Sequence, residues 1–210
     1  MNVTESAFAP TVFFAAAAAR LHQSPADVMR AGGDHVMNPD MLLADVAYRD
    51  AAVLIPVVAR EPEATVILTE RTLNLSSHAG QIAFPGGKID AGDAGPAAAA
   101  LREAEEEIGL VPNSTAIVGY LDPYLSRTGY RIVPVLARID PDFELRPNPE
   151  EVAAVFEVPL GFLLDPANHR RASRVFLGRE RYFYEMPFED RYIWGVTAGI
   201  IRGLYEQVIA

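Results

Sequence analysis

Apolar runs separated by polar punctuation divide the middle of the chain into segments of strand length. Valine-rich runs cover 51–59 and 65–69, and Glu61-Pro62-Glu63 lies between them as a turn. Further runs, each bounded by Pro, Gly or Asn, cover 116–120, 132–139 and 152–158. The pattern predicts a strand in each run, the first two joined by a short turn.

Helical patterns precede this region. The alanine-rich run from Val12 to Ala19, ending at Arg20, predicts a helix docked on the rest of the molecule. Ser24-Pro25 opens a second predicted helix, which Gly32-Gly33 breaks. We therefore expect residues 1–50 to be a helical lead-in packed on a domain formed by residues 51–210.

Two more helices are predicted inside that domain. The segment Pro96 to Ile108 has proline at its first turn, and Gly109 after it suits a left-handed cap. Another helix is expected from about Trp194 to Val208. Strands interleaved with a few helices predict an α/β or α+β layered fold, and no repeat or long linker divides the chain.

Charge and composition narrow the class of partner. The 210 residues carry a formal charge of -10, which repels nucleic acid and anionic membranes. A small anionic ligand would need a local metal ion or arginine cluster. The absence of cysteine excludes disulfides and thiolate catalysis and is compatible with the cytoplasm, where we expect the protein. The run Val12 to Ala19 is too short to span a membrane, and a homodimer is the base-rate expectation.

The helix at 96–108 gathers acids on one side. On a wheel of about 100° per residue with Glu103 at zero, Glu106 lies at about 300° and Glu107 at about 40°. We call these three residues the acidic face. The apolar stripe lies between about 100° and 160°, so the acids are expected to point away from the core, and small Ala99 is expected to leave space for a ligand beside them. The stripe consists of Ala97, Leu101, Ala104 and Ile108.

A solvated surface is the alternative interpretation of such a charge run. Its position argues against that interpretation. Each pair of like charges one turn apart lowers helix stability by a few tenths of a kcal/mol. The helix dipole adds a penalty of about 0.3 to 1 kcal/mol for each acid in the last turn. A divalent cation such as Mg²⁺ or Mn²⁺ reverses the balance, since it prefers carboxylate oxygens. Arg102, four residues before Glu106, is expected to orient a carboxylate.

The acidic segment is preceded by paired glycines in Phe84-Pro85-Gly86-Gly87, where the backbone can approach a ligand or metal closely. Together with these glycines, the segment 102–110 resembles the Nudix box, whose core reads Arg-Glu-apolar-any-Glu-Glu-any-Gly-apolar. The sequence there is Arg-Glu-Ala-Glu-Glu-Glu-Ile-Gly-Leu. Upstream, the acid before the helix is Asp93, and the spacing from Gly87 to Arg102 is one residue longer than the common pattern.

The longer spacing and the segments 68–72 and 78–87 resemble the coenzyme A pyrophosphatase branch of the Nudix hydrolases. The similarity continues through 148–152, 155–160 and 193–198, so it covers roughly residues 50 to 205. One departure is Ser76, where that branch places an arginine. The departure leaves open a Nudix hydrolase of another nucleoside diphosphate, such as ADP-ribose or a dinucleotide.

The resemblance implies an α/β/α sandwich with a mixed sheet, in which the Nudix loop and helix hold Mg²⁺ or Mn²⁺. It implies Glu103, Glu106 and Glu107 as metal ligands, with the Gly87 carbonyl as a further candidate and Arg102 as the orienting residue. It also implies hydrolysis of coenzyme A to 4′-phosphopantetheine and adenosine 3′,5′-bisphosphate by a metal-activated water.

Several roles remain open. Glu103 and Glu151 are both candidates for the general base. Substrate contacts are expected at Gly86 and at Arg71, His78 and Gln81, and the alternative role of the last three is to satisfy loop backbone groups.

The basic stretch 169–181 and Trp194 can each be explained by a structural role instead of a role in binding. The basic stretch 169–181 has two interpretations, a contact to the 3′-phosphate of coenzyme A or, favoured, a surface that balances the acids. It contains His169, Arg170, Arg171, Arg174, Arg179 and Arg181. Trp194 is interpreted as packing. A non-catalytic nucleotide-binding module is the remaining rival, and its signature would be a broken acidic cluster.

Overall fold

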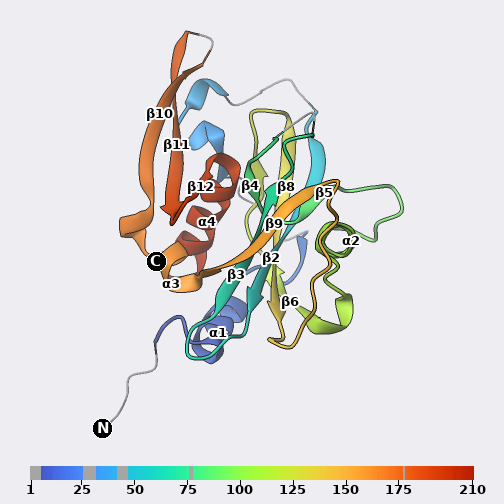
Figure 1. The fold of residues 1–210 in the computed structure, drawn as a ribbon. Helices are drawn as coiled ribbons and strands as arrows, with labels where there is room; N and C mark the ends of the chain where they lie inside the picture. Colours follow the sequence, from blue (N-terminus) through green and yellow to red (C-terminus); the bar gives the residue numbers. More distant parts are fainter. Residues whose placement is uncertain (1–5, 26–31, 42–46, 76–77, 177) are drawn as a thin grey trace.

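The computed structural model describes residues 6–25, 32–41, 47–75, 78–176 and 178–210. Within these residues, nine strands form one sheet (Figure 1). They are β1 Gly32–Gly33, β2 Arg49–Val58, β3 Thr65–Arg71, β4 Ile82–Ala83, β5 Gly86–Lys88, β6 Thr115–Tyr120, β7 Tyr124–Leu125, β8 Tyr130–Ile139 and β9 Val152–Pro159. Each of the strands expected from the apolar runs is present, with ends within two residues of those expected.

The sheet is mixed, as expected from the family resemblance. Strand β2 pairs in parallel with β8 over its whole length, from Arg49 opposite Tyr130 to Val58 opposite Ile139. It pairs antiparallel with β3 and β5, and β3 pairs antiparallel with β9. Strand β2 therefore lies at the centre of the sheet, which accounts for its nearly unbroken apolar sequence.

Helices cover both faces of the sheet (Figure 1). They are α1 Pro10–Arg20, α2 Pro96–Ile108, α3 Leu160–Leu164 and α4 Gly195–Val208, with short 3₁₀ turns η2 Asp34–Val36, η3 Pro39–Met41, η4 Pro112–Ser114 and η5 Pro166–Asn168. Helix α2 packs on one face, and α1, α3 and α4 contribute to the core on the other. The arrangement is the layered sandwich that the resemblance implied.

Alternating residues of β2 supply the two cores. Leu54 and Val58 pack with α2, whereas Ile55 and Val57 pack with the helices on the opposite face. Because successive side chains of a strand point to opposite faces, a strand between two helical layers must be apolar at nearly every position.

Helix α2 has the bounds predicted for it. Pro96 lies in its first turn, where a missing N–H costs nothing, and Gly109 adopts the left-handed conformation with φ 69°. The Gly109 N–H donates to the carbonyl of Glu105 at 2.9 Å. Local sequence therefore fixes where the acidic face begins and ends.

A small second sheet was not predicted. Its strands are β10 Arg170–Phe176, β11 Arg179–Phe188 and β12 Arg191–Trp194, and the β10–β11 hairpin extends away from the sandwich (Figure 1). Asn38 pairs with β11: its Nδ2 donates to the Tyr182 carbonyl at 2.8 Å, and its Oδ1 accepts the Tyr182 N–H at 2.9 Å. Charged residues on both faces of the hairpin conceal the two-residue period that identifies a strand.

The N-terminal part differs from expectation in detail. Helix α1 forms over the alanine-rich run, but the second helix expected after Ser24-Pro25 falls in 26–31, outside the described residues. Gly32-Gly33, expected as a break, pairs in parallel with β7 as the short strand β1. No helix in the described part of the chain is both long and apolar enough to cross a membrane.

Candidate active site

The paired glycines sit on β5, against the central strand. Gly86 lies opposite Val53 and Gly87 opposite Ala52. Gly86 has φ 157°, and a Cβ there would lie 2.6 Å from the Val53 Cα and collide with the Ala52 carbonyl. Only glycine permits this approach of the two backbones.

Gly87 packs directly against Glu103, the first residue of the acidic face. A Cβ at position 87 would collide with the Glu103 carboxylate and lie 2.8 Å from its Oε2. The carboxylate of Glu103 therefore rests against bare backbone. Burial raises the pKa of Glu103, and the neighbouring Arg102 guanidinium partly opposes this shift.

Arg102 connects the loop before α2 to two of its acids. Its Nε and Nη2 form a fork on Asp93, at 3.1 Å to Oδ1 and 3.0 Å to Oδ2. Its Nη1 donates to Glu103 Oε1 at 3.0 Å and to Glu106 Oε2 at 3.2 Å. The fork lowers the pKa of Asp93. The aspartate that departs from the common Nudix pattern is therefore the partner that fixes Arg102.

Glu107 is the buried member of the acidic face, with 3% of its surface exposed. Burial raises the pKa of Glu107 to about 7, and the charges of Glu103 and Glu151 add to the shift. The opposing contacts are weak: Arg71 Nη1 lies 3.5 Å from Glu107 Oε1, and the Gly86 N–H also donates to the carboxylate. This carboxylate lacks a full counter-charge.

Two expectations about the helix face are wrong. The acids do not all point away from the core, because Ala99 and Ala100 are fully buried and widen the apolar stripe until it includes Glu107. Ala99 therefore leaves no space for a ligand, since it packs in the core beneath α2. The expected stripe omitted these alanines, and their small size lets α2 approach the sheet closely.

Glu151 approaches the same cluster from the start of β9. Its charge raises the pKa of both Glu103 and Glu107. Asn148 Nδ2 donates to Glu151 Oε1 at 3.3 Å, and the Glu151 carbonyl accepts the Thr72 N–H at 2.9 Å. The neighbouring Glu150 is exposed. The fold thus brings together Glu151 and the acidic face across more than forty residues of sequence.

The candidate substrate residues separate into two groups. Arg71 contacts Glu107, and its buried Nε makes no hydrogen bond to any described residue. His78 and Gln81 instead bond to each other, with His78 Nδ1 at 2.9 Å from Gln81 Oε1. His78 is exposed and adopts a positive φ of 57° in the turn. Ser76 lies outside the described residues.

The cluster suits a hard divalent cation by its chemistry, because carboxylates and a backbone carbonyl supply only oxygen ligands. Its excess of negative charge, visible in the raised pKa values of Glu103 and Glu107, fits the same ion. No three carboxylate or imidazole groups of the described residues converge tightly enough to enclose an ion. Arg102 instead holds Glu103 and Glu106, and Glu106 is exposed enough to turn away from it.

Much of the basic stretch 169–181 is already paired. Asp40 accepts from Arg179 Nη1 at 2.7 Å and from Arg181 Nη1 at 2.6 Å. Arg171 lies over the Tyr182 ring and Arg174 over the Trp194 ring. His169 is buried, with Nε2 2.7 Å from the Leu163 carbonyl of α3 and its ring edge-on to Tyr205 of α4. These contacts fit the interpretation that the stretch balances acids.

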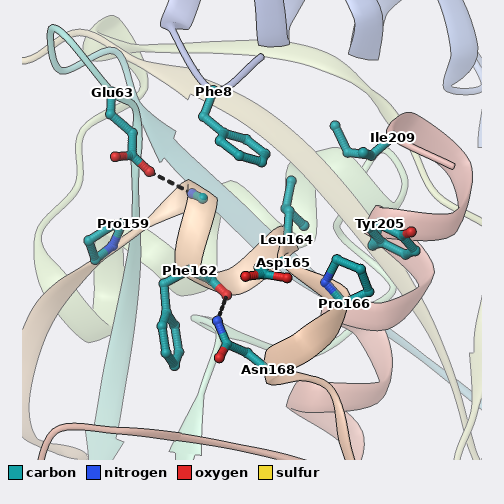
Figure 2. A pocket seen from close by; sticks show the side chains of 11 residues that line it. Phe8, Glu63, Pro159, Phe162, Leu164, Asp165, Pro166, Asn168, Tyr205 and Ile209 are labelled. Atoms are coloured by element: carbon teal, nitrogen blue, oxygen red, sulfur yellow. Dashed lines mark hydrogen bonds between the residues drawn. The ribbon is translucent and has the colours of Figure 1, made fainter. Parts of the chain in front are cut away.

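A cavity of about 680 Å³ lies apart from the candidate residues, between α3 and α4 (Figure 2). Phe8, Phe162 and Tyr205 contribute to its lining. Its polar groups satisfy local backbone: Glu63 accepts the Gly161 N–H at 2.7 Å, and Asn168 Nδ2 donates to the Phe162 carbonyl at 2.9 Å. Volume alone therefore does not locate the chemistry of this molecule.

Comparison with known proteins gives the same family as the motif. A family model described as the NUDIX domain matches residues 48–178. The uncharacterized Nudix hydrolase NudL of Escherichia coli K12 is 42% identical over 173 residues, covering 82% of this chain and 90% of that protein, and NudL of Shigella boydii serotype 4 matches equally.

Among solved structures, an Ap4A hydrolase binary complex from C. elegans aligns with a TM-score of 0.46 and 18% identity, covering 52% of this chain and 80% of that one. The domain match includes more than half of the sequence, and NudL aligns over nearly its whole length. The chain belongs to the Nudix hydrolase family.

Proposed function

We propose that this Nudix hydrolase cleaves the diphosphate bond of coenzyme A or its acyl derivatives, giving 4′-phosphopantetheine and adenosine 3′,5′-bisphosphate. The segments 68–72 and 78–87, with the longer spacing from Gly87 to Arg102, support the coenzyme A branch. Mg²⁺ or Mn²⁺ is the proposed cofactor, since both accept oxygen ligands and leave positions for phosphate oxygens.

One observation carries the hydrolytic part of the proposal. Glu107 is buried beside Glu103 and Glu151 with only a 3.5 Å contact to Arg71 as an ionic counterpart, so the pKa of Glu107 rises to about 7. A group of buried carboxylates with too little positive charge nearby to balance them is typical of a functional site. A divalent cation would supply the positive charge that these carboxylates lack and would at the same time bind the anionic diphosphate.

The proposed ligands are Glu103, Glu106 and Glu107, with the Gly87 carbonyl. When bound, the ion would offset charge on the diphosphate and lower the pKa of a water molecule. Arg102, fixed by Asp93, orients Glu103 and Glu106. The orientation matters because a displacement of about 1 Å can cost about a hundredfold in rate.

The remaining residues are proposed to act on substrate and proton. Arg71, whose Nε is free of hydrogen bonds to the described residues, offers a donor to a phosphate oxygen. Gly86 permits close approach, and His78 and Gln81 form the adjoining turn. Glu103 and Glu151 remain the candidates for accepting the water proton.

Substrate identity can be tested directly. Purified protein with Mg²⁺ or Mn²⁺ is incubated separately with coenzyme A, ADP-ribose and NADH, and the products are identified by mass. We expect coenzyme A to be cleaved fastest, to the two products named above. Equal or faster turnover of ADP-ribose would overturn the coenzyme A assignment and favour the alternative nucleoside diphosphate substrate. No turnover of any of them would favour a binding module.

A further inference from the structure

The segment 146–151, which leads into β9, is bound to the C-terminal end of α2. The last carbonyls of a helix have no partner within that helix. Here the Asn148 N–H donates to the Glu107 carbonyl at 2.8 Å. The Arg146 N–H likewise donates to the Ile108 carbonyl at 2.7 Å. The backbone of Asn148 is therefore attached to Glu107, the buried member of the acidic face.

Gly109 makes this approach possible. A Cβ at position 109 would lie 2.9 Å from both the backbone nitrogen and the Cβ of Arg146. The left-handed conformation of Gly109, with φ 69°, is also one that residues with a side chain rarely adopt. The glycine that ends α2 thus lets the segment before β9 pack against the last helical turn.

The Asn148 side chain uses its two polar atoms on different partners. Its Oδ1 accepts the Glu150 N–H at 3.1 Å, and its Nδ2 donates to Glu151 Oε1 at 3.3 Å. Because a backbone N–H can only donate, the contact with Glu150 determines that the amide nitrogen faces Glu151. One side chain therefore both closes the turn and holds a carboxylate.

Strand β3 holds the same turn from the other side. The Thr72 N–H donates to the Glu151 carbonyl at 2.9 Å, and Thr72 Oγ1 donates to the Glu150 carbonyl at 3.0 Å. Thr72 is buried. These bonds fix the backbone of Glu151 and leave its side chain free to rotate. Among the described residues, Asn148 alone donates a hydrogen bond to the Glu151 carboxylate.

We propose that Asn148 is a positioning residue for hydrolysis, whose side-chain amide holds the Glu151 carboxylate beside the acidic face. This inference rests on the proposed function and deepens it, because Glu151 is a candidate for accepting the water proton. The bond to Asn148 occupies Glu151 Oε1, whereas Oε2 accepts no hydrogen bond from the described residues and is available for a proton.

A change of one atom separates the two roles of Asn148. Asn148→Asp keeps an oxygen for the Glu150 N–H, so the turn should form, but it replaces the donor to Glu151 with an oxygen that repels the carboxylate. We expect kcat for coenzyme A to fall about tenfold and KM to change less than twofold, because a reacting group is displaced while substrate contacts remain.

Asn168→Asp is the matched control. It removes the same kind of donor, the Nδ2 that bonds to the Phe162 carbonyl, at a place apart from the acidic face. Its melting temperature should fall by a few degrees, while kcat stays at the wild-type value. The control therefore shows whether loss of stability alone can lower kcat.

A double-mutant cycle shows whether Asn148 acts through Glu151. Glu151→Gln should lower kcat about a hundredfold, and adding Asn148→Asp should lower it less than a further twofold. In the double variant the new amide can donate to the new carboxylate. The melting temperature lost in Asn148→Asp should then be regained, whereas the activity should not.

The outcomes separate this inference from the proposed function. Wild-type kcat in Asn148→Asp or in Glu151→Gln would overturn the inference, even in a protein that hydrolyses coenzyme A. A tenfold fall on adding Asn148→Asp to Glu151→Gln would overturn it too, because Asn148 would then act without Glu151. In a protein that cleaves no substrate, a regained melting temperature in the double variant would uphold Asn148 as the residue that holds Glu151, while the proposed function fails.

Discussion

The acidic face of α2 and the arginine-bearing β10–β11 hairpin are both charge clusters in the sequence, yet their charges are handled in opposite ways. On α2, burial raises the pKa of Glu107 to about 7, and Arg71, 3.5 Å away, only partly opposes this shift. On the hairpin, donation from Arg181 and Arg179 lowers the pKa of Asp40 to about 2. The acidic face therefore lacks a balancing positive charge, whereas the arginines of the hairpin are neutralised by Asp40 within the fold.

The difference teaches how a charge cluster indicates function. Exposed ion pairs such as those of Asp40 contribute little to stability, but they show that the arginines already have partners. A buried carboxylate with a raised pKa costs stability, and such a cost is tolerated mainly where a ligand offsets it. The acidic face is thus the better candidate for chemistry, although both clusters are dense in charge.

Removing the negative charge of Glu107 should have the largest effect on turnover. Glu107→Gln keeps the shape of the side chain, so we expect a folded protein whose metal-dependent turnover falls about a thousandfold. Its melting temperature should not fall, because the variant no longer buries a charge. Glu105→Gln, on an exposed position of the same helix, is the control and should keep wild-type kcat. Wild-type turnover in Glu107→Gln would exclude Glu107 as a ligand.

A smaller effect should follow from displacing Glu103 without changing its charge. Gly87→Ala places a methyl group where the Glu103 carboxylate lies, so turnover should fall about tenfold to a hundredfold. Gly92→Ala is a matched glycine variant, because nothing lies within 4 Å of the added methyl group. Steady-state kinetics of both variants decide the point. Equal activities would show that contact with Gly87 does not position Glu103.

The neutralised cluster should respond least. Asp40→Asn removes the partner shared by Arg179 and Arg181, and because these pairs are exposed the melting temperature should fall by a few degrees at most. Turnover of coenzyme A should change less than twofold. A large rise in KM would instead indicate that these arginines act on the substrate and that Asp40 regulates their availability.

The pH dependence of stability tests the same contact. The folded-state pKa of Asp40 is about 2, against an ordinary value of 3.8, so folding favours the ionised carboxylate. Its contribution should be complete above about pH 4 and disappear as the pH falls towards about 2. Denaturant melts of wild type and Asp40→Asn should therefore differ most near neutral pH and converge in acid. A constant difference would contradict this assignment.

Local patterns predicted most of the sandwich. Residues 96–108 carry both helix-end signals, and the strands of the large sheet follow apolar runs, because their side chains are buried whatever their partners are. The small sheet escaped prediction because arginines occupy both faces of β10. Its second strand is instead secured by Asn38, a contact across more than 140 residues of sequence.

The sequence by itself determined the family, the bounds of α2 and the residues of the acidic face, because a contiguous motif with its own helix signals needs no distant partner. Tertiary structure alone decided that Glu107 is buried and that Glu151 joins Glu103. It also decided that Asp40 occupies two arginines and that Asn148 bonds to both Glu107 and Glu151. These facts depend on which surfaces pack together and on the local solvation of each charge, and neither is written in the spacing of residues along one segment.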